Sequence, residues 1–407
     1  MEFEVKRLKN GIRTIYLPTD RSQIVHLGLT IPTGSRDESE SEQGMAHFIE
    51  HLLFKGTKKR RAYHILNRLD SVGGELNAYT TKEETVIYAS FLKEHFNRAA
   101  EIISDIVFNS TFPEKEIQKE KEVVLDEILS YRDSPSEMIF DEFEEILFPE
   151  HPIGRNILGT EQTVSRFHRE DLKKFVDYHY ATNSMVISVV GAVEPEKANK
   201  TLEKYFGEIE PRLPRNGQRL APTGAVREHE VELETHQAHI IIGGTSFEAT
   251  HPLRIPMVLL NNILGGPAMN SKLNLNIREK YGIAYNIESV YHPYSDTGVF
   301  SIYLGTDKKW LERSKRLIQK ELKTLRENRL TSTALHRAKQ QLKGHYALSR
   351  ESGAGMMQAM GKSLIVLGKV ESSKEILRRI DAITADEILE AANFSFATER
   401  LTSLIYK

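Results

Sequence analysis

Two histidines and a glutamate stand at a spacing that suits metal-assisted chemistry: His47, Glu50 and His51. On a helix, His47 and His51 lie one turn apart on the same face, and Glu50 lies between them. Neutral imidazole is a good zinc ligand, and a nearby carboxylate can accept a proton from a water that the metal activates. We therefore predict a helix that holds zinc through His47 and His51, with Glu50 as the general base.

The residues around this trio predict a helix with one packing face. Its apolar side chains fall on the side opposite the trio, and Gly56 follows as a helix stop. They are Met45, Phe48, Ile49, Leu52 and Leu53. The alternative is a pair of histidines that only satisfy hydrogen bonds in a core. The position of the trio opposite the packing face disfavours that alternative.

The composition of the whole chain limits the other classes of function. The 407 residues carry a net charge of −2 and no cysteine, so zinc must use histidine and carboxylate ligands. Neither the charge nor its distribution favours a nucleic-acid partner. No apolar run approaches the length of a membrane span, and the first residues resemble no signal or transit peptide. We expect a cytoplasmic protein with no membrane partner.

The order of elements predicts an α+β fold of two similar domains, each a mainly antiparallel sheet packed with helices. Alternating strands fill residues 1–34, and the stretch 75–91 reads as two antiparallel strands or one bent strand. The second half repeats this order, but the counterpart of the metal helix, near 255–263, has neither histidine nor glutamate. The proline-rich stretch 213–222 is the predicted linker. The domains are then 1–212, with the metal, and 223–407, without it.

A second helix, predicted over 113–132, carries two carboxylates on one face. Glu120 and Glu127 are seven residues apart, nearly two turns, and share that face with Val124 and Ile128. Acidic groups on a packing face need partners, because burying a lone carboxylate is costly. Many charged neighbours also fit a solvent-exposed helix, and the helix alone leaves both interpretations open.

With these motifs in view, the chain resembles the pitrilysin or insulinase-type zinc peptidases, specifically their processing-peptidase branch. The resemblance rests on residues 44–57, read as Gly-Met-Ala-His-Phe-Ile-Glu-His-Leu-Leu-Phe-Lys-Gly-Thr. In that family the third zinc ligand is a glutamate 76 positions beyond the second histidine, which is Glu127 here. A supporting glutamate seven positions earlier corresponds to Glu120. The resemblance thus implies one zinc ion per chain, held by His47, His51 and Glu127.

The resemblance also implies where a peptide substrate binds. Residues 73–80 resemble the family's edge strand beside the zinc, which places Asn77, Ala78 and Tyr79 against the substrate backbone. Without the resemblance this stretch is an ordinary Thr-rich strand. Arg278 and Tyr285 match the family's Arg/Tyr motif, whose side chains contact the substrate and the developing oxyanion. By spacing alone they would be a surface pair.

The family's closed chamber contains four such domains, and this chain supplies two. The resemblance therefore implies a clamshell made by two chains, most simply a homodimer whose active sites are shared between subunits. The expected activity is a zinc metalloendopeptidase acting on peptides or unfolded polypeptides. The alternative is an inactive or peptide-binding partner subunit of the same family, and the presence of Glu50 beside the predicted ligands disfavours it.

Overall fold

The computed structural model describes residues 3–20, 22–213, 219–233 and 235–407, which form two compact units. Unit 1 comprises Met1–Ser130, Arg155–Arg219 and Leu348–Ser372, and unit 2 comprises Tyr131–Gly154, Leu220–Ala347 and Ser373–Lys407. Of the predicted linker 213–222, residues 214–218 lie outside the described residues. The predicted domain boundaries stay a prediction, and each unit is described by itself below.

Unit 1 contains a six-stranded, mainly antiparallel sheet in the order β1-β2-β6-β3-β5-β4. Its strands are β1 (Glu4–Arg7), β2 (Arg13–Pro18), β3 (Ile24–Ile31), β4 (Glu75–Thr80), β5 (Thr85–Leu92) and β6 (Val186–Gly191). β4 and β5 form an antiparallel pair, so the stretch 75–91 is two strands and not one bent strand. Among the strands of the described residues, β4 pairs with β5 alone and forms one edge of the sheet.

Helices cover the sheet of unit 1 on one face around a large apolar core. They are α1 (Met45–Leu53), α2 (Ala62–Asp70), α3 (Phe96–Phe108), α4 (Glu114–Arg132), α6 (Glu161–Arg166), α7 (Arg169–His179) and α8 (Pro195–Leu202). Side chains alternate between the two faces of a strand, so Tyr16 of β2 enters this core while Ile15 and Leu17 point to the other face.

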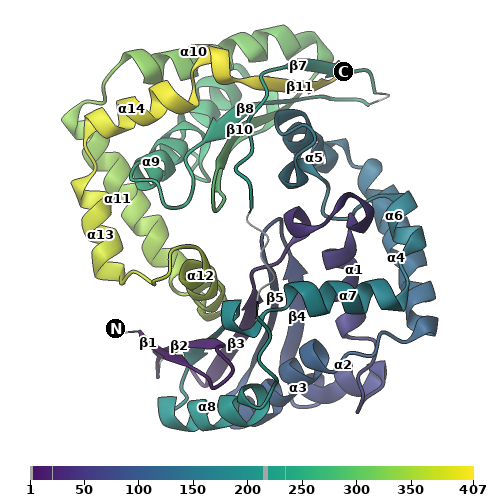
Figure 1. The fold of residues 1–407 in the computed structure, drawn as a ribbon. Helices are drawn as coiled ribbons and strands as arrows, with labels where there is room; N and C mark the ends of the chain where they lie inside the picture. The colour runs from purple at the N-terminus through teal and green to yellow at the C-terminus, as the bar shows by residue number, and fades with distance from the viewer. Residues whose placement is uncertain (1–2, 21, 214–218, 234) are drawn as a thin grey trace. The chain divides into compact units, whose positions relative to one another are not determined.

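That other face is covered by a helix from far along the chain, α12 (Gly353–Val366), which lies against β3 and β6 (Figure 1). Met357, Met360 and Leu364 of α12 pack on Ile15, Leu17 and their neighbours. All six residues of β6 are buried as a result, which explains why all of them except Ser188 are apolar or glycine.

Unit 2 repeats this plan with a five-stranded sheet in the order β7-β11-β8-β10-β9. Its strands are β7 (Glu228–Val231), β8 (Ala238–Ser246), β9 (Ala284–Pro293), β10 (Gly298–Thr306) and β11 (Thr402–Tyr406). The order β11-β8-β10-β9 matches β6-β3-β5-β4 strand for strand, which confirms the predicted α+β fold of two similar, mainly antiparallel sheets.

One face of the second sheet is covered by helices from the second half of the sequence. They are α9 (Arg254–Gly265), α10 (Leu311–Glu327), α11 (Ser332–Ser349), α13 (Ser373–Ala382) and α14 (Ala385–Ser395). The other face packs on α5 (Pro135–Leu147), a helix from the first half, through Ile139, Phe143 and Leu147. Each sheet therefore has one covering helix that comes from the opposite half of the sequence.

None of the helices in the described part of the chain combines the length and the apolar character that crossing a lipid bilayer requires.

Candidate metal centre

Helix α1 carries the predicted metal motif and is anchored by its apolar face. Phe48, Ile49 and Leu52 are completely buried in the core of unit 1, whereas the side chains of His51 and Glu50 stay partly exposed. Gly44 precedes the helix with φ +88°, a left-handed conformation that favours glycine. A Cβ at Gly44 would also lie 2.5 Å from the carbonyl oxygen of Leu158, so the backbone approaches too closely for a larger residue.

A buried carboxylate, Glu38, holds the N-terminus of α1. Its two oxygens accept hydrogen bonds from the backbone N–H groups of Gly44 and Ala46, each at 2.8 Å. Burial raises the pKa of Glu38, and the two backbone donors oppose this rise because they stabilise the ionised form. The carboxylate also complements the positive end of the helix. Glu38 thereby sets the start of the helix that carries His47.

We expect the Glu38→Gln variant to be less stable than the wild type. The NH2 group of glutamine cannot accept a hydrogen bond, so one of the two backbone N–H groups loses its partner. An unsatisfied buried donor costs about 1–3 kcal/mol. Urea unfolding measures the change, and Glu40→Gln, an exposed glutamate of the same loop, is the control. Equal midpoints for the two variants would contradict this role of Glu38.

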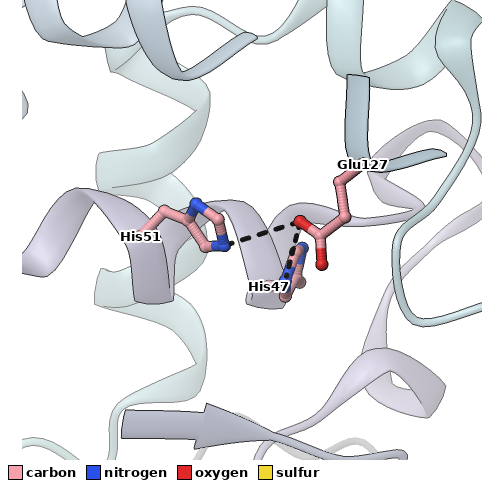
Figure 2. Close-up of side chains that lie close together, drawn as sticks. All are labelled: His47, His51 and Glu127. Atoms are coloured by element: carbon pink, nitrogen blue, oxygen red, sulfur yellow. Dashed lines mark ion pairs between the residues drawn. The ribbon is translucent and has the colours of Figure 1, made fainter. Parts of the chain in front are cut away.

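His47, His51 and Glu127 come together in unit 1, as Figure 2 shows. One potential ligand atom from each lies within 4.8 Å of the other two. The Nε2 atoms of His47 and His51 each lie 3.9 Å from the same oxygen, Oε2 of Glu127. The histidines come from α1 and the glutamate from α4. Two helices therefore aim two nitrogens and one oxygen at a common point.

This arrangement fits a zinc ion. A separation of 3.9 Å is too long for a hydrogen bond between Nε2 and the carboxylate oxygen. Two ligands bound tetrahedrally to one zinc at 2.0–2.2 Å are about 3.4 Å apart. A small inward movement of the side chains therefore gives coordination distances, and two imidazoles with one carboxylate are a donor set that catalytic zinc uses.

The two histidines differ in how their rings are held. His47 is 9% exposed, and its Nδ1 is buried with no hydrogen-bond partner among the described residues. Burial, together with the neighbouring His51, lowers the pKa of His47 to about 4, so this imidazole is neutral and able to bind a metal near pH 7. The ring of His47 is thus held by packing.

His51, by contrast, is held by a carboxylate. Its Nδ1 lies 3.0 Å from Oε2 of Glu120. Burial acts to lower the pKa of His51, but the hydrogen bond to Glu120 and the nearby carboxylates outweigh burial and raise it. An N–H on Nδ1 leaves the lone pair of Nε2 directed toward Glu127. The structure therefore places Glu120 where a supporting residue for His51 should be.

Glu50 lies on the same helix as the two histidines and is partly buried. Burial raises the pKa of Glu50, and a hydrogen bond from the side chain of Thr80 opposes part of that rise. A raised pKa brings a carboxylate closer to neutrality, which suits a group that must both accept and return a proton. Thr80 is the last residue of strand β4.

Asn77, Ala78 and Tyr79 lie on β4, the edge strand of the unit 1 sheet. Asn77 is exposed, and its Oδ1 accepts a hydrogen bond from the backbone N–H of Ala78 at 2.8 Å. The ring of Tyr79 packs edge-on against Tyr88 of β5. An edge strand has unpaired backbone groups that an extended peptide can use. The role of these three residues in substrate binding stays a prediction.

Arg278 and Tyr285 belong to unit 2 and not to the unit that holds the histidines. Arg278 lies in a short π-helix (Asn274–Glu279), where its guanidinium donates to Oδ1 of Asn274 at 3.4 Å. Tyr285 is 58% exposed at the start of β9, and its hydroxyl donates to Asp307. Their predicted contact with a substrate at the zinc stays a prediction.

Three residues beside the site have no role in the sequence-based prediction: Glu38, Thr80 and Lys55. The Nζ of Lys55 lies 2.5 Å from Oε1 of Glu120. Lys55 stands four positions after His51, a spacing that places it on the face of the histidines and could have indicated the contact. No comparable local pattern marks Glu38 or Thr80, because their partners depend on the folded loop and sheet.

Two family models match this chain along most of its length. One, described as "Insulinase (Peptidase family M16)", matches residues 13–161. The other, described as "Peptidase M16 inactive domain", matches residues 166–342. All residues of the candidate metal centre lie within the first of these two ranges.

Similar proteins from several bacteria extend over almost the whole chain. An uncharacterized zinc protease of Bacillus subtilis, YmxG, is 35% identical over 397 residues, which is 98% of this chain and 96% of that protein. An uncharacterized zinc protease of Rickettsia bellii is 35% identical over 407 residues, covering 99% of this chain and 97% of the relative.

Solved structures show the same fold at lower sequence identity. A protease from Helicobacter pylori superposes with a TM-score of 0.92 at 21% identity, covering 100% of this chain and 99% of that one. A Pseudomonas fluorescens structure, titled as a peptidase M16 inactive domain, superposes with a TM-score of 0.93 at 19% identity. The match covers 100% of this chain and 98% of that one. These two likenesses concern the fold alone.

Proposed function

We propose that this chain, which belongs to the insulinase family of peptidases, peptidase family M16, is an active zinc metalloendopeptidase. Its substrates would be peptides or unfolded polypeptide segments. The observation that carries the proposal is the convergence of His47, His51 and Glu127 on one point, with Glu50 on the same helix as the histidines. A protein that only bound peptides would not need a proton acceptor beside a metal centre.

Each residue of the centre has a role that follows from its surroundings. His47, His51 and Glu127 would hold one zinc ion per chain. When bound, zinc polarises a peptide carbonyl and lowers the pKa of a water molecule. Glu50 would accept the proton of the attacking water and deliver it to the leaving amine. Glu120, at 3.0 Å from Nδ1 of His51, would keep the lone pair of that ring on Nε2.

The substrate would be held by groups from both halves of the sequence. We propose that an extended peptide pairs with the edge strand β4 along Asn77, Ala78 and Tyr79. Arg278 and Tyr285 would hold the substrate and donate to the oxyanion, and the exposed hydroxyl of Tyr285 suits that role. These two residues would come from a second copy of the chain in a homodimer with shared sites.

The alternative, an inactive partner subunit, draws support from the word "inactive" in one matching family description. That description covers residues 166–342, and the four residues of the metal centre and its base lie outside this range. A subunit without catalysis has no use for Glu50 beside three ligands. We therefore favour the active peptidase.

Metal analysis and peptide digestion together test the proposal. The purified protein should contain about one zinc per chain and should cut a mixed peptide library, and a chelator should abolish the cutting. Added zinc should restore it. Zinc without cleavage would indicate a metal-binding partner subunit, and neither zinc nor cleavage would indicate an inactive homologue.

We expect the two glutamates of α4 to differ in their effect on zinc. Glu120→Gln should weaken zinc binding by about 10–100-fold, as for other residues that hold a metal ligand in place. Glu127→Gln should weaken it further, because a direct ligand loses its charge. Competition with a chromophoric chelator measures both, with Asp126→Asn, an exposed neighbour on α4, as the control. Equal affinities for the Glu120 and Glu127 variants would refute Glu127 as a ligand.

A further inference from the structure

Lys55 follows directly after the metal helix and contacts the carboxylate that supports His51. Helix α1 ends at Leu53, and the backbone N–H of Lys55 still donates to the carbonyl of Leu52 at 3.1 Å. This turn brings Nζ of Lys55 to 2.5 Å from Oε1 of Glu120. The other oxygen of the same carboxylate, Oε2, is 3.0 Å from Nδ1 of His51. Glu120 therefore uses one oxygen for each partner.

The second contact matters because a carboxylate held at one oxygen can still rotate. The last side-chain torsion of glutamate has broad, shallow minima, so a single hydrogen bond fixes the plane of the group weakly. Glu120 extends from α4, whereas His51 lies in the last turn of α1 and Lys55 in the turn that follows it. With both oxygens engaged, the carboxylate is fixed relative to α1, and so is the imidazole that it contacts.

His51 needs this support more than His47 does. The side chain of His47 is 11% exposed and packed, whereas that of His51 is 23% exposed. Nδ1 of His51 is bonded to Glu120, whereas Nδ1 of His47 has no such partner within the described ranges. The orientation of His51 therefore depends on the Glu120 carboxylate, and that of the carboxylate depends on Lys55.

We propose that Lys55 is a positioning residue of the metal centre: it fixes the Glu120 carboxylate in the orientation that presents Nε2 of His51 to zinc. This inference rests on the proposed zinc site. It assigns to the lysine of the Phe-Lys-Gly segment a role in metal affinity and not in substrate binding. Because Lys55 acts through Glu120, its effect must disappear when the Glu120 carboxylate is absent.

Whether zinc affinity rises or falls when Lys55 is removed distinguishes a positioning role from a purely electrostatic one. A lysine acting only as a positive charge would repel zinc, so its removal would raise zinc affinity. A positioning lysine has the opposite effect, and Lys55→Met should lower the affinity by about tenfold, the lower end of the range for residues outside the ligand set. Lys55→Arg, which keeps a charged donor, should restore most of the affinity.

A double-mutant cycle on zinc affinity provides the test. The metal-free wild type, Lys55→Met, Glu120→Gln and the double variant are titrated with zinc against a chromophoric chelator. Lys55→Met should lower the affinity about tenfold in the wild type and less than about twofold in the Glu120→Gln background. Lys58→Met, which removes an exposed lysine three positions later, should change nothing. Circular dichroism verifies folding, and Lys55→Gln replaces Lys55→Met if the latter does not fold.

Two results would overturn the inference alone: unchanged or raised zinc affinity in Lys55→Met, or an equal loss in both backgrounds. The second result would indicate a general structural effect. If the wild type itself bound no zinc, the proposed function and this inference would both be wrong. The wild-type titration therefore distinguishes the two failures.

Discussion

The Glu50→Gln variant should bind zinc as tightly as the wild type and lose all but about 0.01–1% of its peptide hydrolysis. Removing a general base typically costs 10²–10⁴ in rate. Glutamine has nearly the same shape as glutamate, but its amide cannot accept a proton from water. Because Glu50 is not among the three residues that converge on the metal position, zinc binding should survive.

The measurement compares zinc content and turnover of the same preparations. Glu122→Gln, which removes an exposed charge from α4, serves as the control and should keep wild-type values for both. A Glu50→Gln variant that retains zinc and cleaves peptides at the wild-type rate would show that the proton acceptor is another group. Loss of zinc in this variant would show instead that Glu50 acts on the metal.

The second large effect is a recovery of activity when two inactive variants are mixed. The proposed zinc ligands His47, His51 and Glu127 belong to unit 1, whereas Tyr285 belongs to unit 2. We propose that Tyr285 of one subunit serves the zinc of the other. A heterodimer of Glu50→Gln and Tyr285→Phe chains then has one site with an intact Glu50 and an intact Tyr285. Its activity should approach that of one working site in two.

An active site built within a single subunit predicts that mixing the two variants restores no activity. If Tyr285 served the zinc of its own subunit, each site in the heterodimer would carry one defect, and mixing would restore nothing. An excess of Glu50→Gln chains drives the Tyr285→Phe chains into heterodimers. The control replaces Glu50→Gln by the double variant Glu50→Gln/Tyr285→Phe, which supplies no Tyr285. Absence of recovery after verified subunit exchange would rule out the shared site.

The metal helix could be predicted from the sequence because all its information is local. The spacing of His47 and His51 and the apolar face of α1 depend on one helix and its periodicity. Glu127 lies 76 positions beyond His51, on another helix, and no local pattern links the two. Only the family resemblance identified it, since the helix itself left a surface interpretation open.

Helix α12 was not predicted from the sequence, because several of its positions are glycines that close packing requires and that lower helix propensity. It contains Gly353, Gly355 and Gly361, which lower helix propensity. A Cβ at Gly361 would lie 2.4 Å from Oγ1 of Thr30, and one at Gly353 would lie 2.5 Å from the ring of His26. The glycines allow the helix to approach the sheet closely, and this need becomes visible only when the sheet is known.

Each sheet is covered on one face by a helix from the opposite half of the sequence, and this has a consequence for folding during synthesis. The last strand of the first sheet ends at Gly191, but its covering helix α12 begins at Gly353. At 5–20 residues per second, roughly ten to thirty seconds separate the two on the ribosome. During that interval Ile15, Leu17 and their neighbours form an uncovered apolar surface on a nascent chain. Helix α5 likewise precedes β11, the strand that it packs on, by more than 250 residues, so the first sheet is not fully covered until Val366 has been synthesised and the second not until Tyr406 has.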